Sequence, residues 1–187
     1  MANSSIFQDF DASSAPARAR PALSAAERAF GFVPSALARW AASPTLIEAF
    51  ETLRKLFEHS TLSHLEQEVV ILVVSFENEC ELCMALHSAI LTRENIAPEL
   101  LQALRDGSPL PEPRLRALAD YTRRILTARG KVEEGEITRF LDAGFTREQA
   151  LEVVLGVGAM TLSTFANRLT RAPIDAAFAP FEWRKPS

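Results

Sequence analysis

The chain has 187 residues, of which 48% are hydrophobic and 24% are charged, and its formal net charge is −4. This length fits one domain with at most an additional arm, and the apolar fraction is sufficient for a core. The acidic balance and the lack of any basic run argue against a nucleic-acid partner. The longest apolar run, residues 69–74, is far too short to span a bilayer, so we expect no membrane partner.

The first segment, residues 1–22, is rich in Ala, Ser, Pro and Arg and has no hydrophobic period. We therefore expect a loosely ordered N-terminal arm. The segment lacks the apolar stretch of a secretory signal, and it contains Asp residues, which transit peptides avoid. We expect the protein in a reducing cytoplasm, where two cysteines only three residues apart are more often catalytic or metal-binding than structural.

Residues 23–172 carry the pattern of an all-α domain. A capping signal at Ser24 predicts a helix that ends at Gly31, and Pro34 and Pro44 sit at the starts of the next two helices. Further helices are predicted over residues 63–75, 80–93, 98–105, 114–128, 133–143 and 146–169. The β-branched run within the first of these would also suit a strand, but the strong cap and the lack of a partner strand favour a helix buried on all sides.

The last segment, residues 173–187, follows Pro173 and indicates an extended tail. Its aromatic residues Phe178, Phe181 and Trp183 are expected to pack on this core or on a neighbouring subunit.

Both cysteines of the chain lie close together, at Cys80 and Cys83, and His87 follows four residues after the second. Residues three or four apart share a face of a helix, so Cys83 neighbours both Cys80 and His87. A helix N-terminus favours a thiolate, and a histidine one turn away accepts the thiol proton. Nearby glutamates oppose thiolate formation, although solvent screens them. The pattern predicts reversible thiol–disulfide chemistry.

Three polar residues interrupt apolar helices elsewhere, and one of them, Glu68, bears on the thiols. A buried carboxylate is costly unless it is paired. If the helices of Glu68 and Cys83 form a hairpin, Glu68 would approach the thiols and take the proton of Cys83, directly or through His87 and water. For Glu152 and Asn167 we predict structural hydrogen bonding.

The spaced set of Glu68, Cys80, Cys83 and His87 resembles the signature of the AhpD-like alkylhydroperoxidases in the carboxymuconolactone decarboxylase family. The flanks GFVPSALARWAASPTLIEAFETL and AGFTREQALEVVLGVG resemble its peroxidase-related branch, and the likeness extends over roughly residues 30–170. The resemblance implies an all-α, AhpD-like helical bundle with a central Cys-x-x-Cys helix hairpin. It also implies a homo-oligomer, a trimer or a hexamer.

The resemblance further implies an antioxidant enzyme, a thiol-dependent peroxidase that reduces hydrogen peroxide or organic hydroperoxides. Cys83 would attack the peroxide, Cys80 would resolve the product to a disulfide, and Glu68 and His87 would relay protons. No cofactor would be bound, and an external dithiol, such as a lipoyl-bearing protein, would donate electrons. The founding enzymes have a histidine just before the second cysteine, where this chain has Leu82, so a secondary relay or donor contact is expected to be missing.

Two alternatives remain open at the level of sequence. A general thiol–disulfide oxidoreductase or a redox sensor would use the same cysteine pair. A zinc-binding module would use Cys80, Cys83 and His87, with Glu68 or His64 as the fourth ligand. Three ligands within eight residues of one helix are unusual for a closed zinc site, so we expect no bound metal.

Overall fold

The computed structural model describes residues 6–186, and no strand occurs within that range. Its elements are α1 (Arg20–Phe30), α2 (Ser35–Trp40), α3 (Pro44–Glu58), α4 (His64–Glu77), α5 (Glu81–Arg93), α6 (Pro98–Asp106), α7 (Pro113–Thr127), α8 (Glu134–Asp142), α9 (Arg147–Thr170) and the 3-10 helix η1 (Ala176–Phe181). The prediction of an all-α fold is confirmed.

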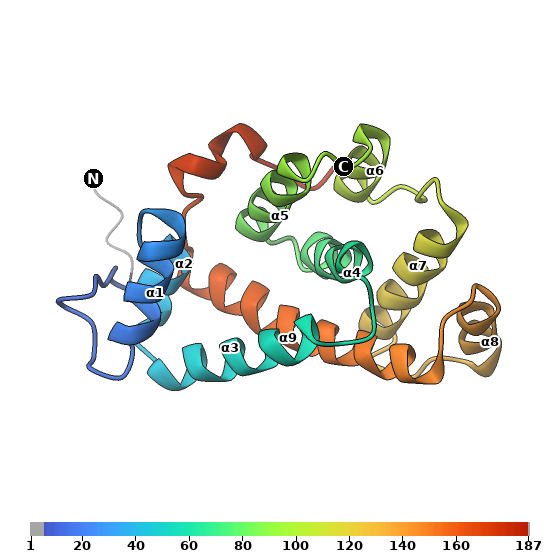
Figure 1. The fold of residues 1–187 in the computed structure, drawn as a ribbon, viewed down its shortest axis with the longest axis horizontal. Coiled ribbons are helices and arrows are strands. Elements are labelled where there is room, and N and C mark those ends of the chain that lie inside the picture. Colours follow the sequence, from blue (N-terminus) through green and yellow to red (C-terminus); the bar gives the residue numbers. More distant parts are fainter. Residues whose placement is uncertain (1–5, 187) are drawn as a thin grey trace.

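Helix α4 lies in the middle of the molecule (Figure 1) and contacts α3, α5, α6, α7 and α9. It begins at the predicted capping box, in which the Glu66 N–H donates to the Ser63 hydroxyl and the Ser63 N–H donates to the Glu66 carboxylate. Its central valines Val69, Val70 and Val74 have no exposed surface. The prediction of a helix buried on all sides is therefore correct.

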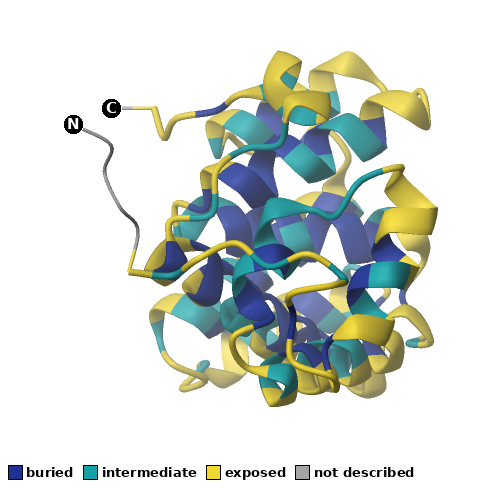
Figure 2. Ribbon diagram, turned by 90° about the vertical axis from the view of Figure 1, so that its left-hand side faces the viewer, coloured by how far each residue is buried: buried dark blue, intermediate teal, exposed yellow. Residues whose placement is uncertain are grey.

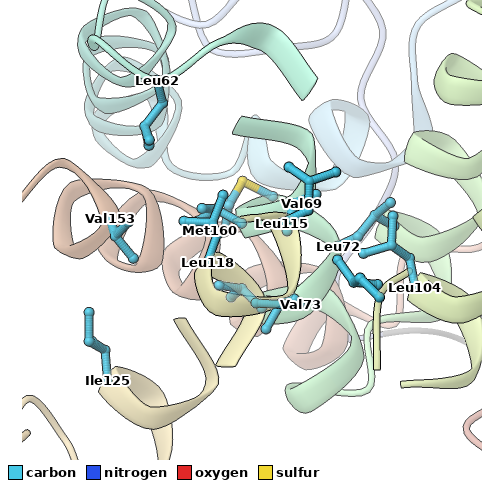
Figure 3. Packing of buried hydrophobic residues seen from close by; sticks show 14 of the residues in the cluster. Leu62, Val69, Leu72, Val73, Leu104, Leu115, Leu118, Ile125, Val153 and Met160 are labelled. Atoms are coloured by element: carbon cyan, nitrogen blue, oxygen red, sulfur yellow. The ribbon is translucent and has the colours of Figure 1, made fainter. Parts of the chain in front are cut away.

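The longest helix, α9, runs along one side of the molecule and packs on α3, α4 and α7 (Figure 1). The core that these helices share includes Val69 and Val73 of α4, Leu118 of α7, and Val153 and Met160 of α9 (Figure 3). The buried segments lie at the centre of the molecule, and the exposed segments lie at its periphery (Figure 2).

Close contact between α9 and its neighbours depends on Gly156. A Cβ atom at this position would lie 2.6 Å from the ring of Phe57 in α3 and 3.0 Å from a methyl group of Val70 in α4. The glycine therefore sets how near the three helix axes can approach.

In length and composition α9 also matches a membrane-spanning helix, and it is the one helix of residues 6–186 that does. Core helices of soluble proteins meet the same criterion, and 44% of the apolar window is buried inside this molecule.

The helix near the N-terminus begins at Arg20, so the predicted start at Ser24 was wrong. Pro21 occupies the first turn, where its missing N–H costs nothing, and Leu23 is completely buried. The predicted end is correct, since Gly31 adopts a left-handed conformation with φ of +80°.

The two ends of the chain both contact the helical domain. Ala15 and Ala19 are buried against the cluster that contains Trp40, although residues 1–5 of the expected arm lie outside the described residues. The expected extended tail contains the turns of η1, and the Trp183 indole N–H donates to the Arg105 carbonyl over 2.7 Å. The division into arm, domain and tail stays a prediction.

Gly156→Ala is predicted to lower the free energy of unfolding by about 1–3 kcal/mol, because the new methyl group would overlap Phe57 and Val70. Gly158→Ala is the matched control on the same helix, since a Cβ there meets no atom within 4 Å. That variant should gain roughly 0.5–1 kcal/mol from helix propensity. Urea unfolding measures both, and equal shifts would contradict the packing described for α9.

Candidate active site

The turn between α4 and α5 brings the first cysteine back against the end of α4. Glu79 adopts a left-handed conformation with φ of +53°, which reverses the chain direction. The Cys80 N–H then donates to the Ser75 carbonyl over 2.9 Å. Cys80 is consequently fixed as the N-cap residue of α5.

Both thiols are free and buried, with 1% of Cys80 and 3% of Cys83 exposed. The Cys83 N–H donates to the Cys80 sulfur over 3.4 Å, which is the position of an N-cap acceptor. The expected neighbourhood of the two cysteines on the first turn of a helix is thus present in the structure.

The pKa values of the two thiols are shifted in opposite directions. The pKa of Cys80 is lowered, chiefly by a hydrogen bond from the Cys83 side chain and also by the Cys83 N–H, Asn167 and the charge of His87, against the effect of burial. The pKa of Cys83 is raised well above its ordinary value by its hydrogen bond to Cys80, by burial and by the charge of Cys80. The hydrogen bond between the two side chains therefore favours a thiolate on Cys80 over a thiolate on Cys83.

Glu68 and His87 form a hydrogen-bonded pair between α4 and α5. Glu68 Oε2 lies 2.9 Å from His87 Nδ1, and 4% of Glu68 is exposed. The pair is close enough for the charge of His87 to lower the pKa of Cys80. The structure thus places the four residues in two contacting pairs, Glu68 with His87 and Cys80 with Cys83.

A fifth residue, Asn167 of α9, contacts both sulfurs. Its Nδ2 lies 3.3 Å from the Cys83 sulfur and 3.8 Å from the Cys80 sulfur. Ser163, one turn earlier on α9, also hydrogen-bonds to Cys83 and opposes the rise in its pKa. Sequence reasoning assigned Asn167 a structural role, because nothing local connects it with cysteines more than 80 residues away. The available signal was a serine and an asparagine four residues apart in an apolar helix.

The same face of α9 holds the turn that carries Cys80. The Asn78 amide donates to the Thr164 hydroxyl over 2.9 Å, and Arg168 donates to the Asn78 carbonyl. Arg168 also forms an ion pair with Glu79 at 3.8 Å. The position of the cysteine turn therefore depends on α9 as well as on α4 and α5.

A short segment after α9 covers the thiols, because Ala172 and Ile174 pack against the cysteine cluster. Asp175 fastens this segment to the start of α2, where it accepts the Ser35 N–H at 3.0 Å. The Ser35 hydroxyl donates to the Pro173 carbonyl over 2.5 Å. This segment therefore shields the sulfurs from solvent together with Ala36 of α2.

Within residues 6–186, no three His, Cys, Asp or Glu side chains are grouped so that they could hold a metal ion. The described part of the chain therefore contains no ligand cluster that would support the zinc-module alternative.

The arrangement of helices is shared with proteins of known structure, although sequence comparison alone finds no relative. No family model matches the chain, and no curated protein matches its sequence. Among solved structures, an alkylhydroperoxidase AhpD core, an uncharacterized peroxidase-related protein from Ralstonia eutropha JMP134, is 22% identical with a TM-score of 0.82, covering 93% of this chain and 94% of that chain. This chain has the AhpD-like fold.

Two further structures with this fold differ in what they are named for. An uncharacterized peroxidase-related protein from Silicibacter sp. TM1040 is 23% identical with a TM-score of 0.74, covering 87% of each chain. A cysteine-to-alanine variant of the debrominase Bmp8, in complex with 2,3,4-tribromopyrrole, is 19% identical with a TM-score of 0.74, covering 96% of each chain. At these identities the likeness establishes the AhpD-like fold and leaves the activity open.

Asp175→Ala removes the bonds that its carboxylate accepts from the Ser35 N–H and hydroxyl. It is predicted to speed labelling of the native thiols at least about five-fold, since a loss of roughly 1 kcal/mol shifts an opening equilibrium by that factor. Reaction of reduced protein with a chromogenic disulfide measures the rate. Asp106→Ala is the control, because Asp106 is exposed and bonds to Gln102 on its own helix. Equal labelling rates in wild type and both variants would show that the segment does not limit access.

Proposed function

We propose that the protein is a thiol-dependent peroxidase that reduces hydrogen peroxide or organic hydroperoxides through a Cys80–Cys83 disulfide. One observation carries the proposal: a buried, hydrogen-bonded thiol pair lies beside a hydrogen-bonded Glu68–His87 pair. The arrangement combines a sulfur nucleophile, a second sulfur within reach and groups that move protons. The peroxidase-related names of two proteins with the same fold agree with it.

In the first step, Cys83 gives its proton to the Cys80 thiolate or to His87, and its sulfur attacks one peroxide oxygen. The O–O bond breaks, Cys83 is oxidised to a sulfenic acid, and the departing alkoxide or hydroxide takes that proton back. The lowered pKa of Cys80 then serves the second step, because Cys80 remains a thiolate.

In the second step, the Cys80 thiolate attacks the Cys83 sulfur. The S–O bond breaks, hydroxide leaves and is protonated to water, and the two sulfurs are joined as a disulfide. An external dithiol reduces this disulfide by two successive exchanges. Glu68 orients His87, so that the imidazole exchanges protons with the thiol pair.

The remaining expectations belong to the same proposal. They are a thiol protein as electron donor, no bound cofactor, a cytoplasmic location and a homo-oligomer of three or six copies. The outer face of α9 exposes Leu151, Phe165 and Leu169, by 72%, 59% and 71%, and a second copy would remove such apolar surface from water. Leu82 is 7% exposed and packs in the cysteine cluster, so the position that holds a histidine in the founding enzymes supplies no proton relay here.

The debrominase with this fold favours a second candidate, reductive removal of bromine from a bromoaromatic ring. The Cys83 sulfur would attack bromine, the C–Br bond would break, and the carbon would take a proton from the relay. Cys80 would then attack the sulfenyl bromide, releasing bromide and forming the same disulfide. A general thiol–disulfide oxidoreductase and a redox sensor are further alternatives that use the pair without either substrate.

Peroxide consumption with excess dithiol is predicted for wild type, with activity falling to background in Cys83→Ser because no attacking sulfur remains. When dithiol is left out, Cys80→Ser should consume one equivalent of peroxide and stop at a sulfenic acid, which dimedone traps. Bromide release from 2,3,4-tribromopyrrole is measured in parallel under the same conditions.

Three outcomes separate the candidates. Peroxide turnover lost in Cys83→Ser, together with a trapped sulfenic acid in Cys80→Ser, supports the peroxidase. Bromide release without peroxide turnover would favour the debrominase reading. If neither substrate is consumed and the variants behave like wild type, the peroxidase proposal is refuted and a sensor or oxidoreductase role takes its place.

A further inference from the structure

Only the nitrogen of the Asn167 amide has hydrogen-bond partners in the described residues. The residue is 4% exposed, and its Nδ2 faces the two sulfurs. Its Oδ1 is buried and has no hydrogen-bond partner among the described residues. A buried acceptor without a donor costs about 1–3 kcal/mol, so an apolar side chain of similar shape would suit the reduced protein better. The unpartnered oxygen therefore points to a donor that is absent from the reduced pair.

The surroundings keep the amide in place. Asn167 lies in the last turns of α9, between Thr164, which accepts a hydrogen bond from Asn78, and Arg168, which donates to the Asn78 carbonyl. Both contacts tie the helix to the turn that carries Cys80. The helix segment that carries the amide is therefore held against the cysteine turn.

The reduced thiols offer Oδ1 no donor. No side chain of residues 6–186 donates to Oδ1, and the Cys83 thiol hydrogen-bonds to Cys80 instead. Oxidation of Cys83 changes this, because a sulfenic acid carries a new O–H group on the sulfur that lies 3.3 Å from the Asn167 amide. Both ends of the planar amide would then have partners.

We propose that Asn167 is a catalytic residue that holds the Cys83 sulfenic acid: its Oδ1 accepts the sulfenic O–H, while its Nδ2 donates to the neighbouring thiolate sulfur. This inference rests on the proposed peroxidase function and deepens it. The interaction exists in the intermediate and not in the resting protein, so it lowers the energy of the intermediate selectively. Holding the hydroxyl group also fixes the S–O bond while Cys80 attacks sulfur and hydroxide departs.

Two substitutions separate the halves of the amide. Asn167→Leu removes both donor and acceptor, whereas Asn167→Asp keeps an acceptor and replaces the donor by negative charge. Thr170→Val is the control, since Thr170 is buried on the same helix and its hydroxyl donates only to carbonyls of α9. Each is made in the wild-type chain and in the Cys80→Ser chain, where the sulfenic acid accumulates.

Three quantities are measured: the thiolate titration by ultraviolet absorbance, the lifetime of the dimedone-reactive sulfenic acid, and the rate of disulfide formation after one equivalent of peroxide. Asn167→Leu should raise the thiol pKa, and it should shorten the sulfenic acid lifetime and slow disulfide formation about ten-fold each, as loss of a buried hydrogen bond predicts. Asn167→Asp should raise the thiol pKa further through like-charge repulsion but keep the longer lifetime. The control should match wild type in all three.

In the Cys80→Ser chain, a sulfenic acid lifetime that Asn167→Leu leaves unchanged would overturn the proposal. Equal losses in both Asn167 variants and the control would overturn it as well. If wild type forms neither a sulfenic acid nor a disulfide with peroxide, the proposed function fails and this role of Asn167 falls with it. Because that failure appears in wild type and the first two appear only in the variants, the experiment tells them apart.

Discussion

The close contact of α9 with α3 and α4 is the constraint on which the site depends. Gly156 permits it, because any side chain there would meet Phe57 and Val70. Two turns further along α9, the residues from Ser163 to Arg168 reach the turn between α4 and α5. The cysteine pair is therefore assembled from three helices, although both cysteines lie within one turn of the chain.

Burial and hydrogen bonding then determine how the sulfurs behave. Neither thiol has significant contact with solvent, so charge on the pair is stabilised by the α5 N-terminus, Asn167 and His87 and not by water. The hydrogen bond between the two sulfurs lowers the pKa of Cys80 and raises that of Cys83. Such a pair suits a cycle in which one sulfur is oxidised while the other stays ready to attack.

Features that depend on neighbours in sequence were predictable. The capping boxes at Ser63 and Thr146 gave the starts of α4 and α9, and the spacing of Cys80 and Cys83 gave their contact on α5. The signal at Ser24 misled, because Pro21 and the burial of Leu23 begin α1 one turn earlier. Local propensity is a weak guide where tertiary packing also acts.

Features that depend on distant segments were not predictable. Asn167 meets the cysteines, and Asp175 meets Ser35, across separations of more than 80 residues that no local pattern encodes. Glu68 is intermediate, since a helix hairpin was enough to suggest its approach to the thiols, and the structure has it bonded to His87. Contact of the tail with the thiols was not predicted either, because Ile174 lies in the segment that was expected to be extended.

The central claim is that Cys80 and Cys83 of one chain form a single redox unit. Peptide mass mapping of reduced protein after one equivalent of peroxide, without any added reductant, tests it directly. The account predicts a Cys80–Cys83 disulfide within one chain, reversed by a dithiol. Unmodified thiols after excess peroxide, or a disulfide that joins two chains, would contradict it.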